Sequence, residues 1–394
     1  MSDNKPAGIS FWFVLLSVFI GFCTFYAPQP LLPAFTEQLN LAPATSAWLL
    51  TIPFIALAFG PIMVGALLQH ASARVLLGVV MFSLGIFLLA FAFAEQFEWK
   101  LLFRLLQSLL LPIIFTAGVT YASQAGEAQY RQRRVALYLS TSIVGGFSGR
   151  LLSGFIADGF GLDAPFMLFG VLAILSALSI TCFVRDVPLQ TARLGVKEIL
   201  KVLGGKPVRL GLLVVFCTFF TYSGMLTALP FRLVDIDPGI SSATISLVYL
   251  GYAVGIFIPV TLDRLISSGF GERQALLIGA LLLCTGLAGM SVPNTYVIMA
   301  FFLVLSSGMF TLHATAAGWL NKIRSGHAGV VNGAYISNYY SAAAVASIIP
   351  LWLIQVFGWS AYIVSQLIIA CSAFWSIQRL SESIQAEQTN NEAD

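Results

Sequence analysis

Long apolar stretches separated by short polar ones occupy the chain from residue 10 to residue 378. Each stretch has about 20 residues, the length at which an α-helix crosses a hydrocarbon core of about 30 Å. A membrane β-barrel would instead show alternating segments of about 10 residues, and the chain has none of these. The pattern predicts twelve membrane-spanning helices, near residues 10–33, 47–68, 74–94, 99–123, 134–157, 164–184, 209–231, 242–262, 274–292, 295–319, 329–354 and 358–378.

Composition agrees with a chain whose solvent is lipid. Of the 394 residues, 58% are hydrophobic and 9% are charged, whereas charged residues make up about a quarter of an ordinary soluble domain. A soluble chain of this length would have no way to hide so much apolar surface from water. The first span follows a single lysine, Lys5, and has no small-residue cleavage site, so we expect a retained helix rather than a signal peptide.

Basic residues orient the predicted spans. The tails and the loops on one side carry 16 of the 20 lysine and arginine residues, whereas the other side carries only Lys100 and Arg232. Because cytoplasmic loops are enriched in these residues, twelve spans would place both termini in the cytoplasm. The expected location is the inner membrane of a bacterium, crossed many times.

Two pairs of similar short segments indicate an internal duplication. FCTFY at 22–26 resembles FCTFF at 216–220, and ALYLSTS at 136–142 resembles GAYISNY at 333–339. Between them, a basic connection at 185–209 contains VKEILKVL, which suits a short amphipathic helix on the membrane surface. Paired helical bundles of this kind can rock against each other and expose a central site to each side in turn. The expected organisation is an N-terminal six-helix bundle (1–184), a cytoplasmic linker (185–208), a C-terminal six-helix bundle (209–378) and a cytoplasmic tail (379–394).

The loop after the second span resembles a transporter motif. It reads GALLQHASAR and is similar to the pattern G-x-L-x-D-R-x-G-R-R, with Gln69 in place of the aspartate and Ser72 in place of the second glycine. The corresponding loop of the second half, LDRLISSGFGER, keeps an aspartate, Asp263. A carboxylate there would cap a helix or pair with a nearby arginine, although it also suits a solvated loop charge. The gating residues expected from these two loops are Gly65, Arg74, Asp263, Arg264 and Arg273.

Two further stretches carry the same resemblance. The fourth span begins LLFRLLQSLL, in which Arg104 and Gln107 match the pattern L-x-x-x-R-x-x-Q-G. The fifth span contains GGFSGRLLSG at 145–154, which has the glycines of G-x-x-x-G-P-x-x-G-G but places Arg150 near the position of the proline. With the helix count and the central loop, these motifs resemble the major facilitator superfamily, in particular its twelve-helix drug:proton antiporter branch.

The resemblance implies an all-α membrane fold of two six-helix bundles that works by alternating access. It also implies that the loop of the first half is a cytoplasmic gate and that Arg104, with Gln107 on the same helix face, takes part in proton coupling. An alternative is that Arg104, about five residues into its span, extends its guanidinium to the periplasmic interface.

Charge inside the membrane singles out Arg150. All 17 acidic residues fall in loops, tails or span ends, and the deep ionisable groups are Arg150 and His313. An arginine at this depth costs about 3 kcal/mol, so it should face a cavity or a partner. Because guanidinium binds carboxylate or phosphate with two parallel hydrogen bonds, an anionic substrate is the expected partner. A backbone carbonyl or the C-terminus of a helix is the structural alternative.

Other polar residues of the spans are expected to line the same cavity, because amide and phenol groups suit a polar organic ligand. For the tyrosines among them, packing or an interfacial aromatic belt is the alternative. His313 is the expected proton carrier, since histidine titrates near neutral pH, and its alternative is a hydrogen-bonded packing role. The predicted lining residues are Tyr26, Gln29, Tyr222, Asn338, Tyr339 and Tyr340.

The predicted function is proton-coupled export of a small acidic organic molecule, such as a carboxylate siderophore. Efflux of neutral or zwitterionic drugs and import of an organic anion are the alternatives. An enzyme is not expected, because the chain has no nucleophile–base set, no metal-ligand spacing and no nucleotide loop. Its five cysteines suit small packing residues. We expect no cofactor, no metal, no nucleic-acid partner and a functional monomer in the bilayer.

Overall fold

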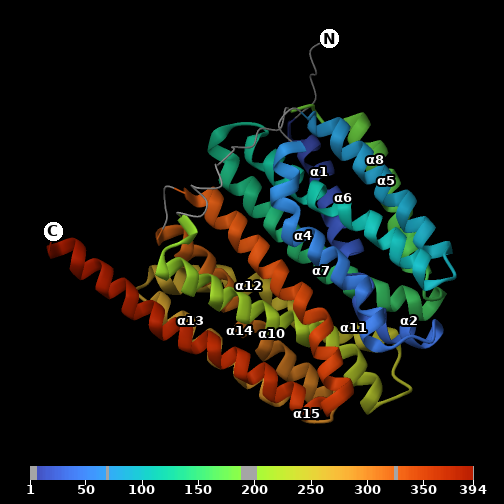
Figure 1. Cartoon of the computed structure of the whole chain (residues 1–394). Helices are drawn as coiled ribbons and strands as arrows, with labels where there is room; N and C mark the ends of the chain where they lie inside the picture. The colour runs from blue at the N-terminus through green and yellow to red at the C-terminus, as the bar shows by residue number, and fades with distance from the viewer. Residues whose placement is uncertain (1–6, 68–70, 188–201, 324–326, 394) are drawn as a thin grey trace. The chain divides into compact units, whose positions relative to one another are not determined.

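The computed structural model describes residues 7–67, 71–187, 202–323 and 327–393, and every regular element in these ranges is a helix (Figure 1). This confirms the all-α prediction. The elements in chain order are α1 (Ala7–Tyr26), η1 (Gln29–Leu31), α2 (Leu32–Gln38), α3 (Pro43–Ser46), α4 (Trp48–Leu67), α5 (Ala73–Phe93), α6 (Phe97–Gln124), η3 (Ala128–Tyr130), α7 (Arg131–Phe160), α8 (Ala164–Phe183), α10 (Lys206–Ile236), α11 (Ser242–Val248), η4 (Tyr249–Ala253), α12 (Val254–Ser267), α13 (Glu272–Gly289), α14 (Thr295–Ile323) and α15 (Ala328–Ala393).

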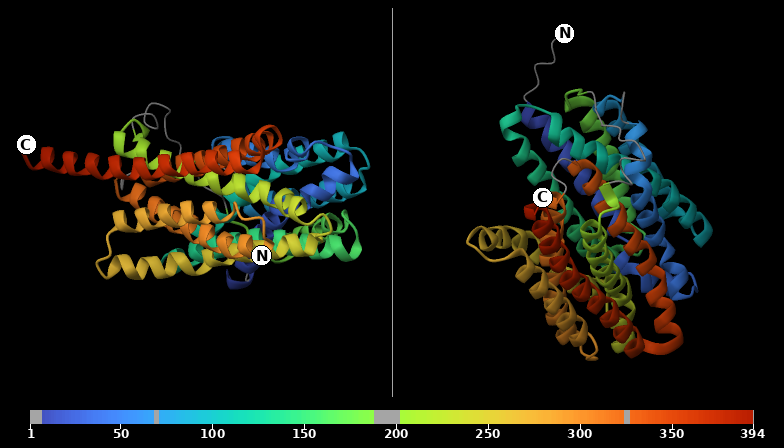
Figure 2. Two further views of the ribbon diagram at one scale, coloured as in Figure 1. Left: turned by 90° about the horizontal axis from the view of Figure 1, so that it is seen from below. Right: turned by 60° about the vertical axis from the view of Figure 1, so that its left-hand side comes forward.

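Within the described ranges, eleven helical stretches are long and apolar enough to cross a membrane. The last of them, Gly329–Leu380, has 52 residues, or about 78 Å of helix, which is more than twice the thickness of a hydrocarbon core. Gly358 interrupts it with a φ of 82°, and the chain reverses direction there (Figures 1 and 2). Two antiparallel spans require this geometry. The twelfth crossing and the cytoplasmic side of the termini stay predictions.

Proline and glycine divide two of the predicted spans. α1 ends at Tyr26, and Pro28 and Pro30, which have no N–H to donate, lead the chain into η1. The eighth predicted span consists of α11, η4 and α12, with the tighter 3₁₀ turn at Tyr249–Ala253. Within that turn, a Cβ atom on Gly251 would lie 2.6 Å from the Phe302 ring. The spans predicted near 10–33 and 242–262 are present as Ile9–Gln38 and Ser242–Ser267, each with a break in its helix.

The chain forms two compact units. Unit 1 contains Met1–Arg193 and Gly239–Tyr249, and unit 2 contains Leu194–Pro238 and Leu250–Asp394. α11 thus groups with the helices of unit 1, whereas α12 belongs to unit 2. The amphipathic helix expected within the linker falls mainly in 188–201, outside the described residues. The predicted division into bundles, linker and tail stays a prediction.

A buried lysine joins three helices at one end of unit 1. The side chain of Lys100 is 1% exposed, and its ammonium group donates to the Asp163 carboxylate at 2.7 Å and to the carbonyl of Phe91 at 3.1 Å. The ammonium also lies 4.9 Å from the centre of the Phe91 ring. Lys100 therefore joins the end of α5, the start of α6 and the residue before α8.

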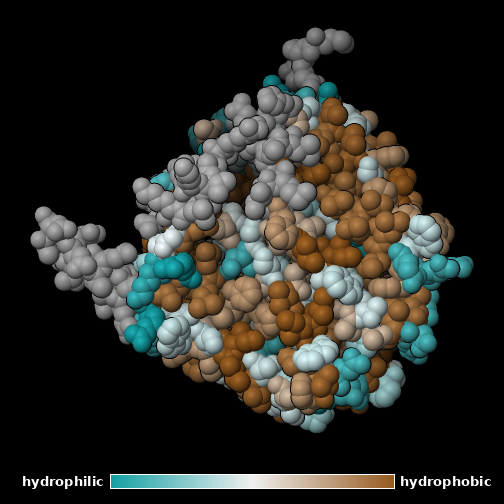
Figure 3. Space-filling model, in the orientation of Figure 1, coloured by the Kyte–Doolittle hydropathy of each residue, from teal (hydrophilic) through white to brown (hydrophobic). Residues whose placement is uncertain are grey.

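The surface is apolar over much of the face seen in Figure 3, with hydrophilic side chains grouped toward its edges. Large apolar side chains such as Trp12, Phe59, Phe257 and Ile368 are more than half exposed. Such a surface is unstable in water and matches the hydrocarbon of a bilayer.

Candidate functional site

Two arginines, Arg104 and Arg150, lie in the interior of unit 1, each only 1% exposed. Arg104 belongs to α6 and Arg150 to α7. A buried guanidinium needs acceptors for its five N–H donors. The acceptors differ between the two residues, and this difference separates a structural arginine from a candidate binding arginine.

Arg104 donates mainly to backbone carbonyls. Its Nε donates to the carbonyl of Leu49 at 2.7 Å, its Nη1 to that of Thr24 at 3.0 Å and its Nη2 to that of Phe25 at 2.5 Å. Nη1 also donates to Oε1 of Gln107 at 3.0 Å. One side chain therefore connects α6 with α1 and α4.

Two prolines explain why these carbonyls need a side-chain donor. In a helix each carbonyl accepts from the N–H four residues later. Pro28 stands four residues after Thr24 and Pro53 four residues after Leu49, and proline has no N–H. Arg104 supplies the missing donors. The alternative that Arg104 extends to the periplasmic interface does not fit a side chain that is 1% exposed; its role in proton coupling stays a prediction.

Both polar atoms of the Gln107 amide form hydrogen bonds. Its Oε1 accepts from Arg104, and its Nε2 donates to the carbonyl of Phe87 in α5 at 3.0 Å. The predicted pairing of Arg104 and Gln107 on one helix face is present in the structure.

Arg150 makes a different set of contacts. Its Nε donates to Oε1 of Gln29 at 2.6 Å, and its Nη1 donates to the carbonyl of Gly146 at 2.8 Å. The guanidinium carbon lies 3.7 Å from the centre of the Tyr26 ring and 5.6 Å from that of Tyr249. The structure therefore brings three predicted residues, Tyr26, Gln29 and Arg150, into one site.

Local backbone features create this site. The break after α1 turns Gln29 toward α7, 121 residues further along the chain. Gly146 leaves room for the ring, because a Cβ there would lie 3.2 Å from atoms of Tyr26. Tyr249 was not among the predicted lining residues, because nothing in the sequence separates it from an aromatic packing residue.

The electrostatic character of unit 1 follows from where the carboxylates lie. No acidic residue whose side chain the structure describes is buried. The contacts of the Arg150 guanidinium include an amide, a carbonyl and two aromatic rings. Rings of this kind attract a cation by about 0.5 to 2 kcal/mol.

Three predicted lining residues of unit 2 have contacts within that unit. The hydroxyl of Tyr222, a residue 2% exposed, lies 3.0 Å from Oγ of Ser306. Asn338 donates from Nδ2 to the carbonyl of Leu212 at 2.7 Å. Tyr340 is 4% exposed. These contacts fit packing between α10, α14 and α15, and the predicted substrate contacts of these residues stay predictions.

His313 lies in an aromatic cluster of unit 2. Its Nδ1 forms a hydrogen bond with the hydroxyl of Tyr335. The Phe219 ring meets it edge-on at 5.3 Å, and the Tyr339 ring lies 6.3 Å away. Tyr339 in turn packs on Tyr340 at 4.1 Å. Tyr335 was not among the predicted lining residues, although it stands only four residues before Tyr339.

The predicted gate of the first half contains an unexpected carboxylate. Ser72 caps α5 by accepting from the N–H of Val75 at 3.2 Å, and its hydroxyl donates to Asp186 at 2.5 Å. Asp186 follows α8 and places a negative charge near the N-terminus of α5, where such a charge is favourable. Gly65 lies in the last turn of α4 and Arg74 in the first turn of α5, whereas Gln69 lies outside the described residues.

In the second half, Asp263 and Arg264 are exposed near the end of α12. Arg273 in α13 donates to Oε1 of Gln378 in α15 at 2.6 Å. The three residues lie toward one end of unit 2, and their gating role stays a prediction.

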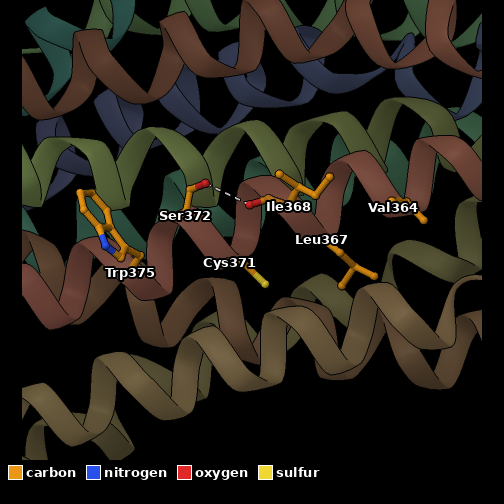
Figure 4. A pocket seen from close by; sticks show the side chains of 6 residues that line it. All are labelled: Val364, Leu367, Ile368, Cys371, Ser372 and Trp375. Atoms are coloured by element: carbon orange, nitrogen blue, oxygen red, sulfur yellow. Dashed lines mark hydrogen bonds between the residues drawn. The ribbon is translucent and has the colours of Figure 1, made fainter.

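A hollow of about 420 Å³ lies on the outer side of α15 and holds none of the predicted residues (Figure 4). Val364, Ile368 and Trp375, which line it, are more than half exposed. Ser372, which also lines the hollow, donates its hydroxyl to the carbonyl of Ile368 at 3.0 Å. The hollow therefore suits lipid chains. Over the described residues, no three His, Cys, Asp or Glu side chains group as metal ligands.

Close helix packing supports the Arg150 site and yields a prediction. A Cβ on Gly149 would lie 2.4 Å from the carbonyl oxygen of Cys23, whereas one on Gly159 of the same helix meets nothing within 4 Å. Gly149→Leu should push α1 away from α7 and cost about 1–3 kcal/mol or more. We expect its thermal unfolding midpoint in detergent to fall by several degrees relative to Gly159→Leu. Equal midpoints for the two variants would contradict the packing described.

Comparison with known proteins agrees with the fold. The family model described as Major Facilitator Superfamily matches residues 14–347. The uncharacterized MFS-type transporter YybF of Bacillus subtilis (strain 168) is 21% identical over 385 residues, 94% of each chain. The inner membrane transport protein YnfM of Escherichia coli (strain K12) is 26% identical over 375 residues, covering 91% of this chain and 88% of YnfM.

Among solved structures, a bacterial homologue of the human lysosomal transporter Spinster has a similar fold, with a TM-score of 0.80 and 15% identity. The match covers 96% of this chain and 99% of that one. The helical architecture, the apolar surface and the family match over most of the sequence lead to one conclusion. This chain is a multi-span membrane transporter that belongs to the major facilitator superfamily.

Proposed function

We propose that this transporter exports a small organic molecule with acidic groups, of the carboxylate siderophore class, in exchange for protons. It would act as a monomer by alternating access in the inner membrane of a bacterium. The observation that carries the proposal is the buried Arg150, held by Gln29 and Tyr26 in a unit where no described acidic side chain is buried.

A substrate carboxylate would compete with Gln29 as the hydrogen-bond acceptor of Arg150. Gln29 offers Arg150 a neutral amide oxygen. An ionised carboxylate forms a shorter bond of roughly twice the strength and can accept from two N–H groups at once. A carboxylate that reaches this site would therefore displace Gln29 and hold the guanidinium in its place. A lipophilic cation would be repelled by the positive charge of the guanidinium.

For the proton, we propose His313. It lies in a helix of unit 2 and contacts Tyr335, Tyr339 and Phe219. Imidazole is the side chain that ordinarily changes charge between about pH 5 and 8. The aromatic contacts hold the ring in place, while the hydroxyl of Tyr335 provides a hydrogen-bond partner at Nδ1.

This role of His313 predicts a loss of pH dependence. In membrane vesicles, His313→Ala should retain counterflow of the substrate but lose most of the effect of an imposed proton gradient. Tyr335→Phe is the matched control, because it keeps the ring and removes only the hydroxyl at Nδ1. Proton-driven transport by His313→Ala with an unchanged pH profile would remove His313 as the carrier.

A multidrug exporter of neutral compounds is the second candidate, and aromatic packing beside Arg150 favours it. Phe25 lies 4.1 Å from Tyr26 and 5.2 Å from Phe54 between ring centres. Such rings suit planar apolar molecules. Import of an organic anion remains the third candidate, because the Arg150 site would bind the same anion from either side.

A metabolite comparison distinguishes the three candidates. A strain that lacks the gene is compared with its parent, inside and outside the cell. We expect an acidic metabolite to accumulate inside the deletion strain and to decline outside, and restoring the gene should reverse both changes. Accumulation of neutral compounds alone would favour the multidrug function, and depletion of an acid inside the cell would favour import.

A further inference from the structure

Six polar side chains within unit 2 have a buried side-chain N or O atom without a hydrogen-bond partner among the described residues, and four of them are uncharged side chains of α10 and α15. They are Thr221 and Ser223 on α10, and Tyr362 and Gln366 on the part of α15 that follows Gly358. Thr221, Tyr362 and Gln366 are 0% exposed. In Gln366 both the amide nitrogen and the amide oxygen have no hydrogen-bond partner among the described residues. Leaving such groups unpaired is costly, above all inside a membrane.

Neighbouring threonines on α10 donate their hydroxyls to backbone carbonyls of their own helix. Thr218 donates to the carbonyl of Val214 at 2.7 Å, and Thr227 donates to the carbonyl of Ser223 at 3.0 Å, each four residues earlier. Thr221 lies between them on the same helix and makes no such bond. Its hydroxyl is therefore available to a partner outside its own helix.

The unpaired groups converge between α10 and α15. A Cβ on Gly224 would lie 3.5 Å from the hydroxyl of Tyr362 and 3.5 Å from the carbonyl oxygen of Ala346. Gln366 is one turn beyond Tyr362 on the same helix face. Because α10 and the second part of α15 run in opposite directions (Figures 1 and 2), Gln366 lies level with the turn of α10 that contains Thr221.

A backbone acceptor joins this group. Pro350 stands four residues after Ala346, so the carbonyl of Ala346 has no N–H from its own helix to accept. The place where three helical segments meet therefore gathers a phenol, an amide, an aliphatic hydroxyl and a carbonyl. The set carries no charge and contains both donors and acceptors.

We propose that Thr221, Ala346, Tyr362 and Gln366 form a hydration site, which takes up water when α10 and the second part of α15 separate during the transport cycle. Water is the ligand because it donates and accepts together, as this uncharged set requires. In the packing seen here the polar atoms are fully buried and the site is closed. The site does not depend on the anion or the proton proposed above.

Thiol labelling tests whether water reaches the site. N-ethylmaleimide crosses membranes but reacts with the thiolate, which forms only in contact with water. In a variant whose five cysteines are replaced, Thr221→Cys should react at least about tenfold faster than Thr218→Cys. Thr218 is the matched control, because it is the same residue type on the same helix, is 1% exposed and has its hydroxyl bonded. Equal rates would overturn the proposal.

Substitution of Gln366 tests the same site by thermal unfolding and by thiol labelling. Gln366→Leu removes two unpaired atoms and should raise the thermal unfolding midpoint, while it slows labelling of Thr221→Cys. Tyr362→Phe should leave the midpoint unchanged or raise it. Gln107→Leu is the control, since both ends of Gln107 are bonded, and it should lower the midpoint. A lower midpoint for Gln366→Leu, or labelling unchanged by it, would overturn the proposal.

Discussion

Arg104→Ala should prevent the folded transporter from accumulating in the membrane. The substitution removes the donors to three backbone carbonyls, those of Thr24, Phe25 and Leu49. Leaving a buried acceptor unpaired costs about 1–3 kcal/mol, so the loss is about 3–9 kcal/mol. Proteins are stable by about 5–15 kcal/mol in all. The measurement is the yield of monodisperse protein by size-exclusion chromatography after detergent extraction.

Two comparisons make this prediction specific. Arg133→Ala removes an exposed arginine and should leave the yield unchanged. Adding Pro53→Ala to Arg104→Ala returns an N–H to the carbonyl of Leu49 and should recover part of the yield. A normal yield for Arg104→Ala, or no gain from Pro53→Ala, would show that Arg104 does not stabilise the fold through these carbonyls.

Arg150→Ala should abolish export of the acidic substrate while the protein still folds. Its side chain donates to the amide of Gln29 and to the carbonyl of Gly146, and that carbonyl keeps its ordinary helical partner, the N–H of Arg150 itself. The cost to stability is therefore about 1–3 kcal/mol. Transport should fall at least about thirtyfold, as loss of a charged hydrogen-bonded pair of 2–5 kcal/mol implies.

The measurement is reversal of the metabolite accumulation in the deletion strain, normalised to the amount of protein in the membrane. Arg150→Lys keeps the charge but loses the planar pair of donors, so it should transport with reduced affinity. Gln29→Leu leaves the guanidinium in place and should retain transport. Full complementation by a well-expressed Arg150→Ala would exclude Arg150 as the anion-binding group.

Much of the architecture was predictable from the sequence. Apolar stretches of about 20 residues predict helices because lipid offers the backbone no hydrogen-bond partner, and a helix satisfies the backbone internally. Gly358, the first residue of the last predicted span, adopts a positive φ and interrupts the final helical stretch, and the twelfth crossing stays a prediction. Proline breaks after Tyr26 were less predictable, because proline is often tolerated within membrane helices.

The candidate site was only partly predictable. Arg150, Tyr26 and Gln29 were each identified from their type and depth, but their mutual contact depends on a separation of 121 residues between Gln29 and Arg150. Tyr249 and Tyr335 have no signal in one sequence that separates them from packing residues. The carboxylate of Asp186 at the start of α5 joins residues 114 positions apart, which helical periodicity does not address.

By itself, the sequence determined that this protein is a bundle of membrane helices with two arginines and a histidine within its spans, because hydropathy and backbone hydrogen bonding act locally. Only the tertiary structure decided what the two arginines do. Both are buried in unit 1, yet one faces carbonyls that two prolines leave without donors, and the other faces an amide and aromatic rings. The difference lies in which distant helices pack against each arginine, and packing between distant segments is not encoded in any local pattern.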